Sequence, residues 1–287
     1  MLINPPYSRL RGTKESTEMV TPIGLSYIAA YLKSEGHDVL VYDSNYSPVE
    51  RLPRFNNLKK LFDSFDKYAD ALKLEDHPVW DECAKVVERE KPDVVGVSVL
   101  SPVRGAALRI ARICKSVDPA VKVVFGGYHP SGYPEDVLSQ DCVDAVVRGE
   151  GEKTFSEYVK AWGGAGALRD IPGLSFKDNG SVVHNQDRDL IEDLDSLPFP
   201  TDFLLERVTG KAPIQYGRGC PFGCKFCSDI VIWKRRTRYR SAENVVDEMT
   251  DVIKRKKLRE FTFIDGTFNI NREKVVVLCE LLLRKKM

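Results

Sequence analysis

The run VVGVSV at residues 94–99 decides the fold, because it is apolar almost throughout and fits a strand better than an amphipathic helix. A second run of this kind, KVVFGG, follows at residues 122–127. Uniformly apolar strands are typical of parallel sheets that helices cover on both faces. The two runs therefore predict an α/β fold whose first half is a doubly wound, flavodoxin-like parallel sheet.

On both sides of these runs, short apolar strands alternate with amphipathic helices. Further strands are expected at residues 1–3, 39–42 and 145–147. The helix that begins at Thr21-Pro22, an N-cap residue followed by proline, carries apolar side chains at i, i+3, i+4 and i+7. Ligands of doubly wound sheets bind outside the carboxyl ends of the strands, so the loops there are the candidate binding region.

The chain changes character after residue 162, where glycine and proline become frequent. Strand-like segments at residues 174–177 and 181–184 flank Asp178-Asn179-Gly180, a strong hairpin signal because the turn needs positive φ. From residue 211 the order is strand, helix, strand, helix, which is the start of an α/β barrel or sheet. We expect a sheet domain over residues 1–162, a linker with a hairpin over 163–210, and these first βα units over 211–287.

Composition and charge exclude several classes of protein. Lys plus Arg number 43 and Asp plus Glu number 42, so the formal net charge is +1, which makes nucleic acid or an anionic membrane an unlikely main partner. No apolar run reaches the ~18–20 residues of a membrane span, and the N-terminus lacks the apolar core of a signal peptide, so we expect a cytoplasmic location. Seven cysteines, three of them within eight residues, do not fit a secreted disulfide framework.

The segment GRGCPFGCKFC at residues 217–227 carries the chemistry. Its three thiols lie on a glycine-rich loop and can converge on one centre, and thiolate is the ligand that iron–sulfur clusters and zinc select. A structural zinc site takes four closed ligands, yet no histidine follows His184, and Cys279 lies on the apolar face of a predicted helix. An iron–sulfur cluster with one open iron is therefore favoured over zinc.

The segment CPFGCKFC, placed after a short strand, resembles the radical SAM superfamily. The resemblance implies that Cys220, Cys224 and Cys227 hold a [4Fe–4S] cluster whose open iron binds S-adenosylmethionine (SAM). One electron from an external reductant of the flavodoxin or ferredoxin type would then cleave SAM to give a 5′-deoxyadenosyl radical. The same resemblance implies a partial TIM barrel, places Phe226 against the adenine, and makes Asp265 a further candidate for contacts with SAM.

The first half of the chain resembles the cobalamin-binding domain that precedes some radical SAM domains. The motifs that carry this resemblance are, in order, NPP (4–6), PIGL (22–25), GHDV (36–39), PDVVGVS (92–98), GGYHP (126–130) and RGEGE (148–152). The family includes methyltransferases and the anaerobic magnesium-protoporphyrin cyclase type. Its implied cobalamin contacts are Asn4, Pro5, Ser98, Gly126, Gly127, His129, Gly149 and Glu150.

Several of these residues have a structural alternative. The loop after the first strand has no histidine that could coordinate cobalt, and His129 is either near the cofactor or a structural hydrogen-bonding residue. Glu150 faces a ligand or is an ordinary acid at a helix N-terminus. The basic run 233–240 binds RNA phosphate or, the favoured alternative, flanks the cluster loop, where some arginines contact SAM or a substrate carboxylate and others are solvated.

Other cysteines are expected in the core. Cys83 and Cys114 share helical faces with apolar residues, and the helix predicted over residues 272–286 has four residues on its inward face. These four residues are Val275, Cys279, Leu282 and Leu283.

The sequence supports three hypotheses about function. The first is a cobalamin-dependent radical SAM enzyme that transfers a methyl group to, or cyclises, an unreactive carbon of a small-molecule or peptide substrate. The second is a cobalamin-free, methylthiotransferase-like RNA-modifying protein, and the third is a non-catalytic Fe–S or corrinoid-binding fragment. Residues 212–287 cover about two and a half βα units at ~31 residues each. We therefore expect the chain alone to be an incomplete catalyst, completed by a missing barrel segment, and we assign no catalytic residue.

Overall fold

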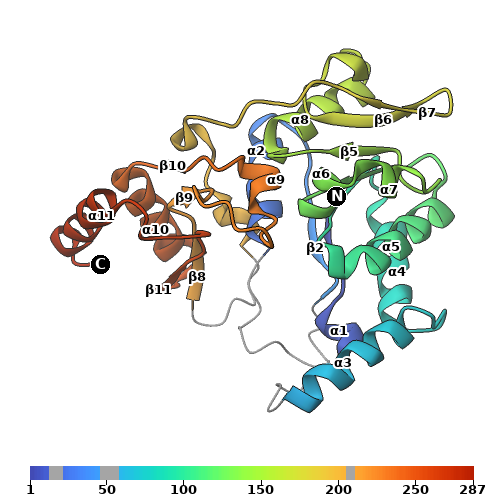
Figure 1. Cartoon of the computed structure of the whole chain (residues 1–287), viewed down its shortest axis with the longest axis horizontal. Coiled ribbons are helices and arrows are strands. Elements are labelled where there is room, and N and C mark those ends of the chain that lie inside the picture. Colours follow the sequence, from blue (N-terminus) through green and yellow to red (C-terminus); the bar gives the residue numbers. More distant parts are fainter. Residues whose placement is uncertain (13–21, 46–57, 205–210) are drawn as a thin grey trace.

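The computed structural model describes residues 1–12, 22–45, 58–204 and 211–287, which form two units side by side (Figure 1). The larger unit is a mostly parallel sheet with helices on both faces, as expected for a doubly wound α/β fold. The smaller unit, orange to red in Figure 1, contains the cysteine-rich loop. No helix in these four ranges is both long and apolar enough to cross a membrane.

The main sheet has seven strands in the order β2-β1-β3-β4-β5-β6-β7. The first five pair in parallel, while β6 and β7 are antiparallel. The strands are β1 (Leu2–Asn4), β2 (Val41–Asp43), β3 (Val94–Ser98), β4 (Lys122–Gly126), β5 (Ala145–Val147), β6 (Leu174–Asp178) and β7 (Ser181–His184).

Alternate residues of each strand enter two separate cores. In β4, Val123 and Phe125 pack toward α4 and α5, whereas Val124 packs toward α2 and α8. This double burial explains why the strands are apolar on both faces. The helices of this unit are α1 (Ser8–Arg11), α2 (Ile23–Ser34), α3 (Leu58–Ala71), α4 (Pro78–Glu90), α5 (Arg104–Val117), α6 (Tyr128–Gly132), α7 (Pro134–Leu138) and α8 (Gly151–Trp162). The predicted N-cap Thr21 lies outside the described residues.

The predicted hairpin forms, with Asn179 and Gly180 both at positive φ in its turn. Its first strand, β6, pairs with β5, with Ala145 opposite Phe176. The hairpin therefore extends the main sheet instead of standing apart in a linker, because its inward residues complete the core under α8. Short 3-10 turns lead from it to the smaller unit: η3 (Leu194–Ser196) and η4 (Pro200–Phe203). The domain limits 1–162, 163–210 and 211–287 stay a prediction.

The smaller unit begins with the βα order expected from the sequence. Its core contains Ile214, Tyr216, Val245, Met249 and Leu278. Its elements are β8 (Lys211–Ile214), β9 (Gly217–Arg218), α9 (Asp229–Trp233), β10 (Arg238–Tyr239), α10 (Ala242–Lys256), β11 (Glu260–Phe263) and α11 (Arg272–Lys285). Strands β8 and β11 are parallel, with Ile214 opposite Phe263.

Strand β8 ends at Ile214, before Tyr216. The physical reason is that the N–H of Tyr216 points to the Asp265 carboxylate and not into the β8–β11 ladder. The chain turns there, and β9 pairs with β10 instead.

The inward face predicted for α11 is wrong for two of its four residues, while Val275 and Leu282 are half-buried. Leu278 and Leu281 are buried, whereas Leu283 is 78% exposed and Cys279 is exposed. Among the described elements, α11 packs chiefly against α10, so only a narrow stripe of it is covered. Cys83 and Cys114, in contrast, are buried in the core as predicted.

Candidate functional site

The eight residues implied to contact cobalamin all lie at the carboxyl edge of the main sheet. Asn4, Ser98 and Gly126 are the last residues of β1, β3 and β4, and Pro5, Gly127 and His129 follow shortly after those strands. Gly149 and Glu150 come directly after β5, before α8. Because β1, β3, β4 and β5 are neighbours in the sheet, the structure brings these residues to one side of the molecule.

Gly127 allows the loops after β3 and β4 to touch. Its φ is +100°, and a Cβ there would lie 3.0 Å from the carbonyl oxygen of Val99. The neighbouring N–H of His129 donates to the same oxygen at 3.1 Å. A larger residue at position 127 would separate the two loops, so glycine is required by geometry.

The imidazole of His129 is held from both sides. Its Nδ1 lies 3.0 Å from Ser101 Oγ, and its Nε2 lies 3.0 Å from Asp136 Oδ2. The Arg104 guanidinium beside Asp136 holds the pKa of that carboxyl below its usual value. Both ring nitrogens are thus engaged within the chain, and whether His129 also lies near the cofactor stays a prediction.

The cysteine loop runs from β9 to β10, with Arg218 paired opposite Arg238. Gly219 begins the loop at φ +92°, and a Cβ there would lie 1.9 Å from the Arg236 carbonyl oxygen. Any side chain at this position would force the two ends of the loop apart. The glycine before the first cysteine is thus what lets the loop close on itself.

The three cysteines are free and reachable from solvent. Cys224 is exposed, Cys220 and Cys227 are half-buried, and the Sγ of Cys220 lies 3.6 Å from Thr267 Oγ1. Within the described ranges, no three His, Cys, Asp or Glu side chains lie close enough together to hold a metal ion, so the sulfurs are not gathered on one centre here. Three unpaired thiols on one loop fit a cluster that gathers them, and their role as ligands stays a prediction.

The two residues predicted to contact SAM flank this loop differently. The Phe226 ring is 93% exposed, open to a planar partner. The carboxylate of Asp265 accepts hydrogen bonds from the N–H groups of Gly217 and, at 3.4 Å, Tyr216. Burial raises the pKa of this carboxyl, and the two N–H groups oppose that shift. Asp265 therefore ties the loop after β11 to the start of the cysteine loop, a role that the sequence did not predict.

Helix α9, which follows the last cysteine, docks on α6 of the larger unit. The Tyr128 hydroxyl donates to Asp229 Oδ1 at 2.7 Å and accepts from the indole of Trp233 at 3.2 Å. Burial and the neighbouring Asp229 raise the pKa of Tyr128 above its ordinary value. Tyr128 lies between Gly127 and His129, so one short segment serves both the carboxyl edge of the sheet and the cysteine loop. Sequence reasoning missed this residue.

A buried ion cluster joins the two units beside this contact. Arg218 donates to Glu150 at 2.8 Å and to Glu152 at 2.7 Å, and Arg238 donates to Glu150 at 2.7 Å. All four side chains are at most 5% exposed. Burial opposes the charge of Arg218, but the two glutamates outweigh it and raise its pKa. The Glu150 carboxylate thus points into the seam between the units.

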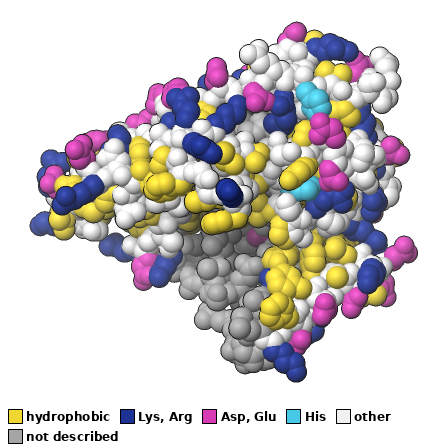
Figure 2. Space-filling view, in the orientation of Figure 1, with side chains coloured by type: hydrophobic (Ala, Val, Ile, Leu, Met, Phe, Trp, Pro, Cys, Tyr) yellow, Lys and Arg dark blue, Asp and Glu magenta, His cyan; other side chains and the backbone are white. Residues whose placement is uncertain are grey.

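The basic run 233–240 is largely neutralised by acids of the same chain. Arg240 pairs with Glu248 in the interior, and Arg238 with Glu150. On the surface, Lys234 pairs with Asp187 at 3.0 Å and Arg236 with Glu192 at 2.7 Å. Figure 2 shows basic and acidic side chains interspersed around the face in view, with no large patch of one sign. The pairing of Arg238 and Arg240 with buried acids of the same chain was not predicted from the sequence.

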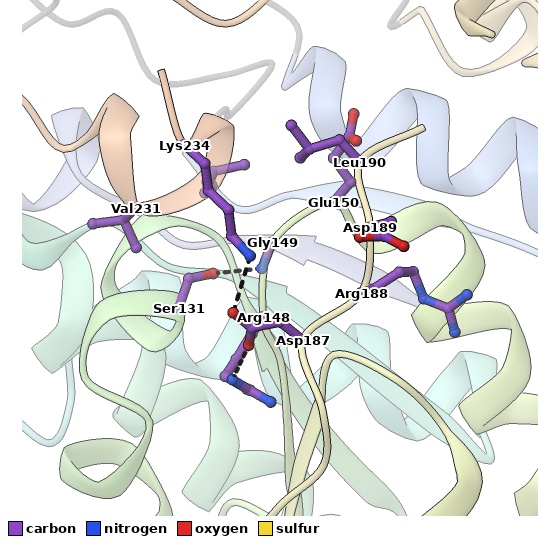
Figure 3. Close-up of a pocket in the computed structure, with 11 residues that line it drawn as sticks. Ser131, Arg148, Gly149, Glu150, Asp187, Arg188, Asp189, Leu190, Val231 and Lys234 are labelled. Carbon is purple, nitrogen blue, oxygen red and sulfur yellow. Dashed lines mark hydrogen bonds and ion pairs between the residues drawn. The ribbon is translucent and has the colours of Figure 1, made fainter. Parts of the chain in front are cut away.

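A pocket lies where the carboxyl edge of β5 faces α9 (Figure 3). Its empty volume is about 470 Å³, part of it open to solvent. Lys234 and Arg148 both reach Asp187 across it, and the N–H of Gly149 donates to Ser131 Oγ at 3.0 Å. The pocket places predicted cofactor residues of the larger unit opposite the helix that follows the cysteines.

Two family models match the chain, one in each unit. The B12 binding domain model matches residues 13–159, and the radical SAM superfamily model matches residues 214–286. The first covers strands β2, β3, β4 and β5 with their carboxyl ends, and the second covers most of the unit with the cysteine loop. The cofactors expected from the sequence are those for which these two families are named.

Individual proteins agree with this assignment. An uncharacterized methyltransferase of Pyrococcus horikoshii is 32% identical over 262 residues, which cover 89% of this chain and 50% of that protein. The anaerobic magnesium-protoporphyrin IX monomethyl ester cyclase of Rubrivivax gelatinosus is 29% identical over 100% of this chain and 48% of its own length. The chain therefore spans about half the length of the curated relatives it matches.

A solved structure shares the fold of the whole chain. The cobalamin-dependent S-adenosylmethionine radical enzyme OxsB, solved with aqua-cobalamin and S-adenosylmethionine bound, matches with a TM-score of 0.72 at 18% identity. The match covers 100% of this chain and 37% of OxsB. Both units and their connection are therefore found together in that enzyme.

Proposed function

Because the chain belongs to the radical SAM proteins that carry an N-terminal B12-binding domain, we propose that it acts in cobalamin-dependent radical SAM chemistry. The reaction is methyl transfer to, or cyclisation of, an unreactive carbon of a small-molecule or peptide substrate, with a one-electron donor of the flavodoxin or ferredoxin type. The observation that carries this proposal is the seam, where the cysteine loop is held directly against the carboxyl edge of the main sheet. A cytoplasmic location stays a prediction.

The residues of each unit have separate tasks in this proposal. Cys220, Cys224 and Cys227 would hold the [4Fe–4S] cluster, with Phe226 and Asp265 on the side where SAM binds. When bound, the cluster and SAM supply a radical, and cobalamin supplies a carrier for the methyl group. Cobalamin would face the residues that end β1, β3 and β4 and that follow β4 and β5. These are Asn4, Pro5, Ser98, Gly126, Gly127, His129 and Gly149, with Glu150 contributing backbone only.

The edge that would face cobalamin offers cobalt no imidazole. The loop after β1 contains no histidine, and both ring nitrogens of His129 contact Ser101 and Asp136. We propose that cobalamin binds this chain without a histidine ligand from the described loops of that edge. The electron paramagnetic resonance spectrum of bound cob(II)alamin tests this in protein that carries 15N-histidine. A histidine ligand would split the cobalt lines into doublets, whereas cobalamin's own benzimidazole base would give triplets.

The decisive test of the proposed function compares two cysteine variants after anaerobic reconstitution with iron and sulfide. Cys224→Ala removes one proposed ligand, whereas Cys279→Ala removes an exposed thiol on α11, outside the loop. We expect Cys224→Ala to lose nearly all bound iron and still bind cobalamin, and Cys279→Ala to retain both. Equal iron in the two variants, or zinc in the unaltered protein, would refute the proposal.

A further inference from the structure

Both ends of the cysteine loop are held by a single carboxylate. Arg218, in β9, is the last residue before the loop, and Arg238, in β10, is the first residue after it. The two arginines are directly opposite each other in the β9–β10 pair. Glu150 accepts from Arg218 through Oε1 at 2.8 Å and from Arg238 through Oε2 at 2.7 Å. Its two oxygens therefore close the base of the loop.

Glu150, Arg218 and Arg238 form a clamp, which is buried and also bonds to the backbone beside it. Glu150 is 2% exposed in its side chain, and each arginine is 5% exposed. The N–H of Ile191 donates to Glu150 Oε2 at 2.8 Å, and Arg238 donates to the Ile191 carbonyl at 2.6 Å. Charge-assisted bonds in such a dry place are strong, and removing one partner leaves the others uncompensated.

Glu150 also belongs to the edge where cobalamin is proposed to bind. It follows Gly149, which lines the pocket of Figure 3, and it immediately precedes the first residue of α8. Glu152, two residues further along, contacts only one end of the loop, through Arg218. Among the described residues, Glu150 is thus the carboxylate that joins both ends of the cysteine loop to this edge.

Other contacts hold the two units together without touching the loop. Turn η4 bridges them: Ser26 of α2 donates to the Phe203 carbonyl at 3.1 Å, and Asp202 pairs both with Lys33 of α2 and with Arg255 of α10. Tyr27 of α2 accepts from Arg240 at 3.1 Å. Loss of Glu150 alone would therefore leave the units docked and loosen the base of the loop, while α9 stays held by Tyr128.

We infer that Glu150 is a positioning residue, which fixes where the cysteine loop stands relative to the cobalamin edge. This inference rests on the proposed function for its purpose, but the clamp itself is a property of the chain without cofactors. Through the two arginines, Glu150 sets the separation and orientation of the two cofactor sites.

The test uses Glu150→Gln, with Glu157→Gln as the matched control on the exposed side of α8. Hydrogen exchange of residues 219–237 in the cofactor-free protein should rise about tenfold in Glu150→Gln, the size of effect expected when one charge-assisted bond is lost. Alkylation of half-buried Cys227 should rise by a similar factor, while exposed Cys279 serves as the internal reference. Glu157→Gln should match the unaltered protein in both measurements, and Glu152→Gln should lie between.

A second measurement separates positioning from general stability. With cob(II)alamin bound and the cluster reduced, the two spins broaden each other's electron paramagnetic resonance lines according to their distance. Glu150→Gln should keep its iron and corrinoid content but show weaker or more scattered broadening than the Glu157→Gln control.

The outcomes are distinct. Failure of the unaltered protein to bind iron or corrinoid would overturn the proposed function, and the exchange measurement would still test the clamp. Exchange and alkylation in Glu150→Gln that equal those of Glu157→Gln would overturn the clamp, and unchanged broadening would overturn the positioning role. If Glu150→Gln does not fold, Arg218→Lys, which keeps the charge but loses the contact of two separate nitrogens with Glu150 and Glu152, should show the same loosening of residues 219–237, and its absence would contradict the inference.

Discussion

The carboxyl edge of the main sheet and the cysteine loop face each other across the seam but are prepared for ligands in opposite ways. At the edge, Gly127 packs against Val99, and His129 is held by Ser101 and Asp136. In the loop, the thiols are unpaired, apart from one another and partly exposed. The edge is shaped by the fold alone, whereas the loop is fixed at its base and at α9, and its cysteine segment awaits a cluster to gather the sulfurs.

The largest expected effect comes from breaking the base of the loop at Gly219. Gly219→Ala would place a Cβ 1.9 Å from the Arg236 carbonyl, at a φ of +92°. We expect a loss of about 3 kcal/mol in unfolding free energy, from steric overlap added to an unfavourable φ. Urea denaturation followed by tryptophan fluorescence measures it.

The matched control for this substitution is Gly180→Ala in the hairpin turn. Gly180 also has positive φ, +81°, but a Cβ there would meet nothing within 4 Å. Gly180→Ala should lower the unfolding free energy by only about 1 kcal/mol. Equal losses in the two variants would mean that contact with Arg236 does not close the loop.

Acid should weaken the seam before it weakens the main sheet. Burial disfavours ionisation of Glu150, but Arg218 and Arg238 outweigh it and hold the pKa of that carboxyl below its ordinary value of 4.5. A lowered pKa contributes stability that is complete above about pH 4.5 and is lost as the pH falls through the folded-state pKa. Hydrogen exchange of residues 217–239 should therefore accelerate in that range.

The control for the acid experiment is Glu248 of α10. Burial raises the pKa of Glu248 despite its partner Arg240, so its contribution to stability has the opposite dependence on pH. Glu152 of α8 still contacts Arg218 in the variant tested. Glu150→Gln should flatten the acid response of residues 217–239 without removing the response of α10. An unchanged acid response in this variant would show that Glu150 does not carry it.

A smaller effect is expected at the contact between α6 and α9. Tyr128→Phe removes a hydroxyl that joins Asp229 and Trp233, at a cost of about 1–2 kcal/mol. The hydrogen-exchange rate of residues 229–233 should rise accordingly. The control, Tyr133→Phe, changes a ring that is 63% exposed and should leave this rate unchanged. If both variants behave alike, the hydroxyl does not anchor α9.

The smallest effect is expected on the surface of the basic run. Arg236 and Glu192 are more than half exposed, so Arg236→Gln should change unfolding free energy by about 0.5 kcal/mol or less. The difference should vanish at high salt, because exposed pairs are screened. A cost comparable to that of Gly219→Ala would contradict the distinction between exposed and buried pairs in this run.

The sequence predicted the parts of the fold that repeat locally. The runs at residues 94–99 and 122–127 are apolar on both faces, which identified the covered sheet, and Asp178-Asn179-Gly180 identified the hairpin. The inward face of α11 was misjudged, because helical spacing alone does not say how much of a helix its neighbours cover.

The seam could not be predicted from local pattern. Glu150 is separated by 68 residues from Arg218 and by 88 from Arg238, and an acid before a helix looks like an ordinary helix-start residue. Tyr128 carries no polar pattern that distinguishes it from a core tyrosine. The three cysteines were recognisable because their spacing is local, whereas the residues that position them come from elsewhere in the chain.

The most direct test of the account is the content of both cofactors in one anaerobically reconstituted sample of the unaltered chain. The account predicts that iron, sulfide and corrinoid are retained together after gel filtration, in amounts that correspond to one [4Fe–4S] cluster and one cobalamin per chain. Zinc in place of iron, or a cluster without any retained corrinoid, would contradict it.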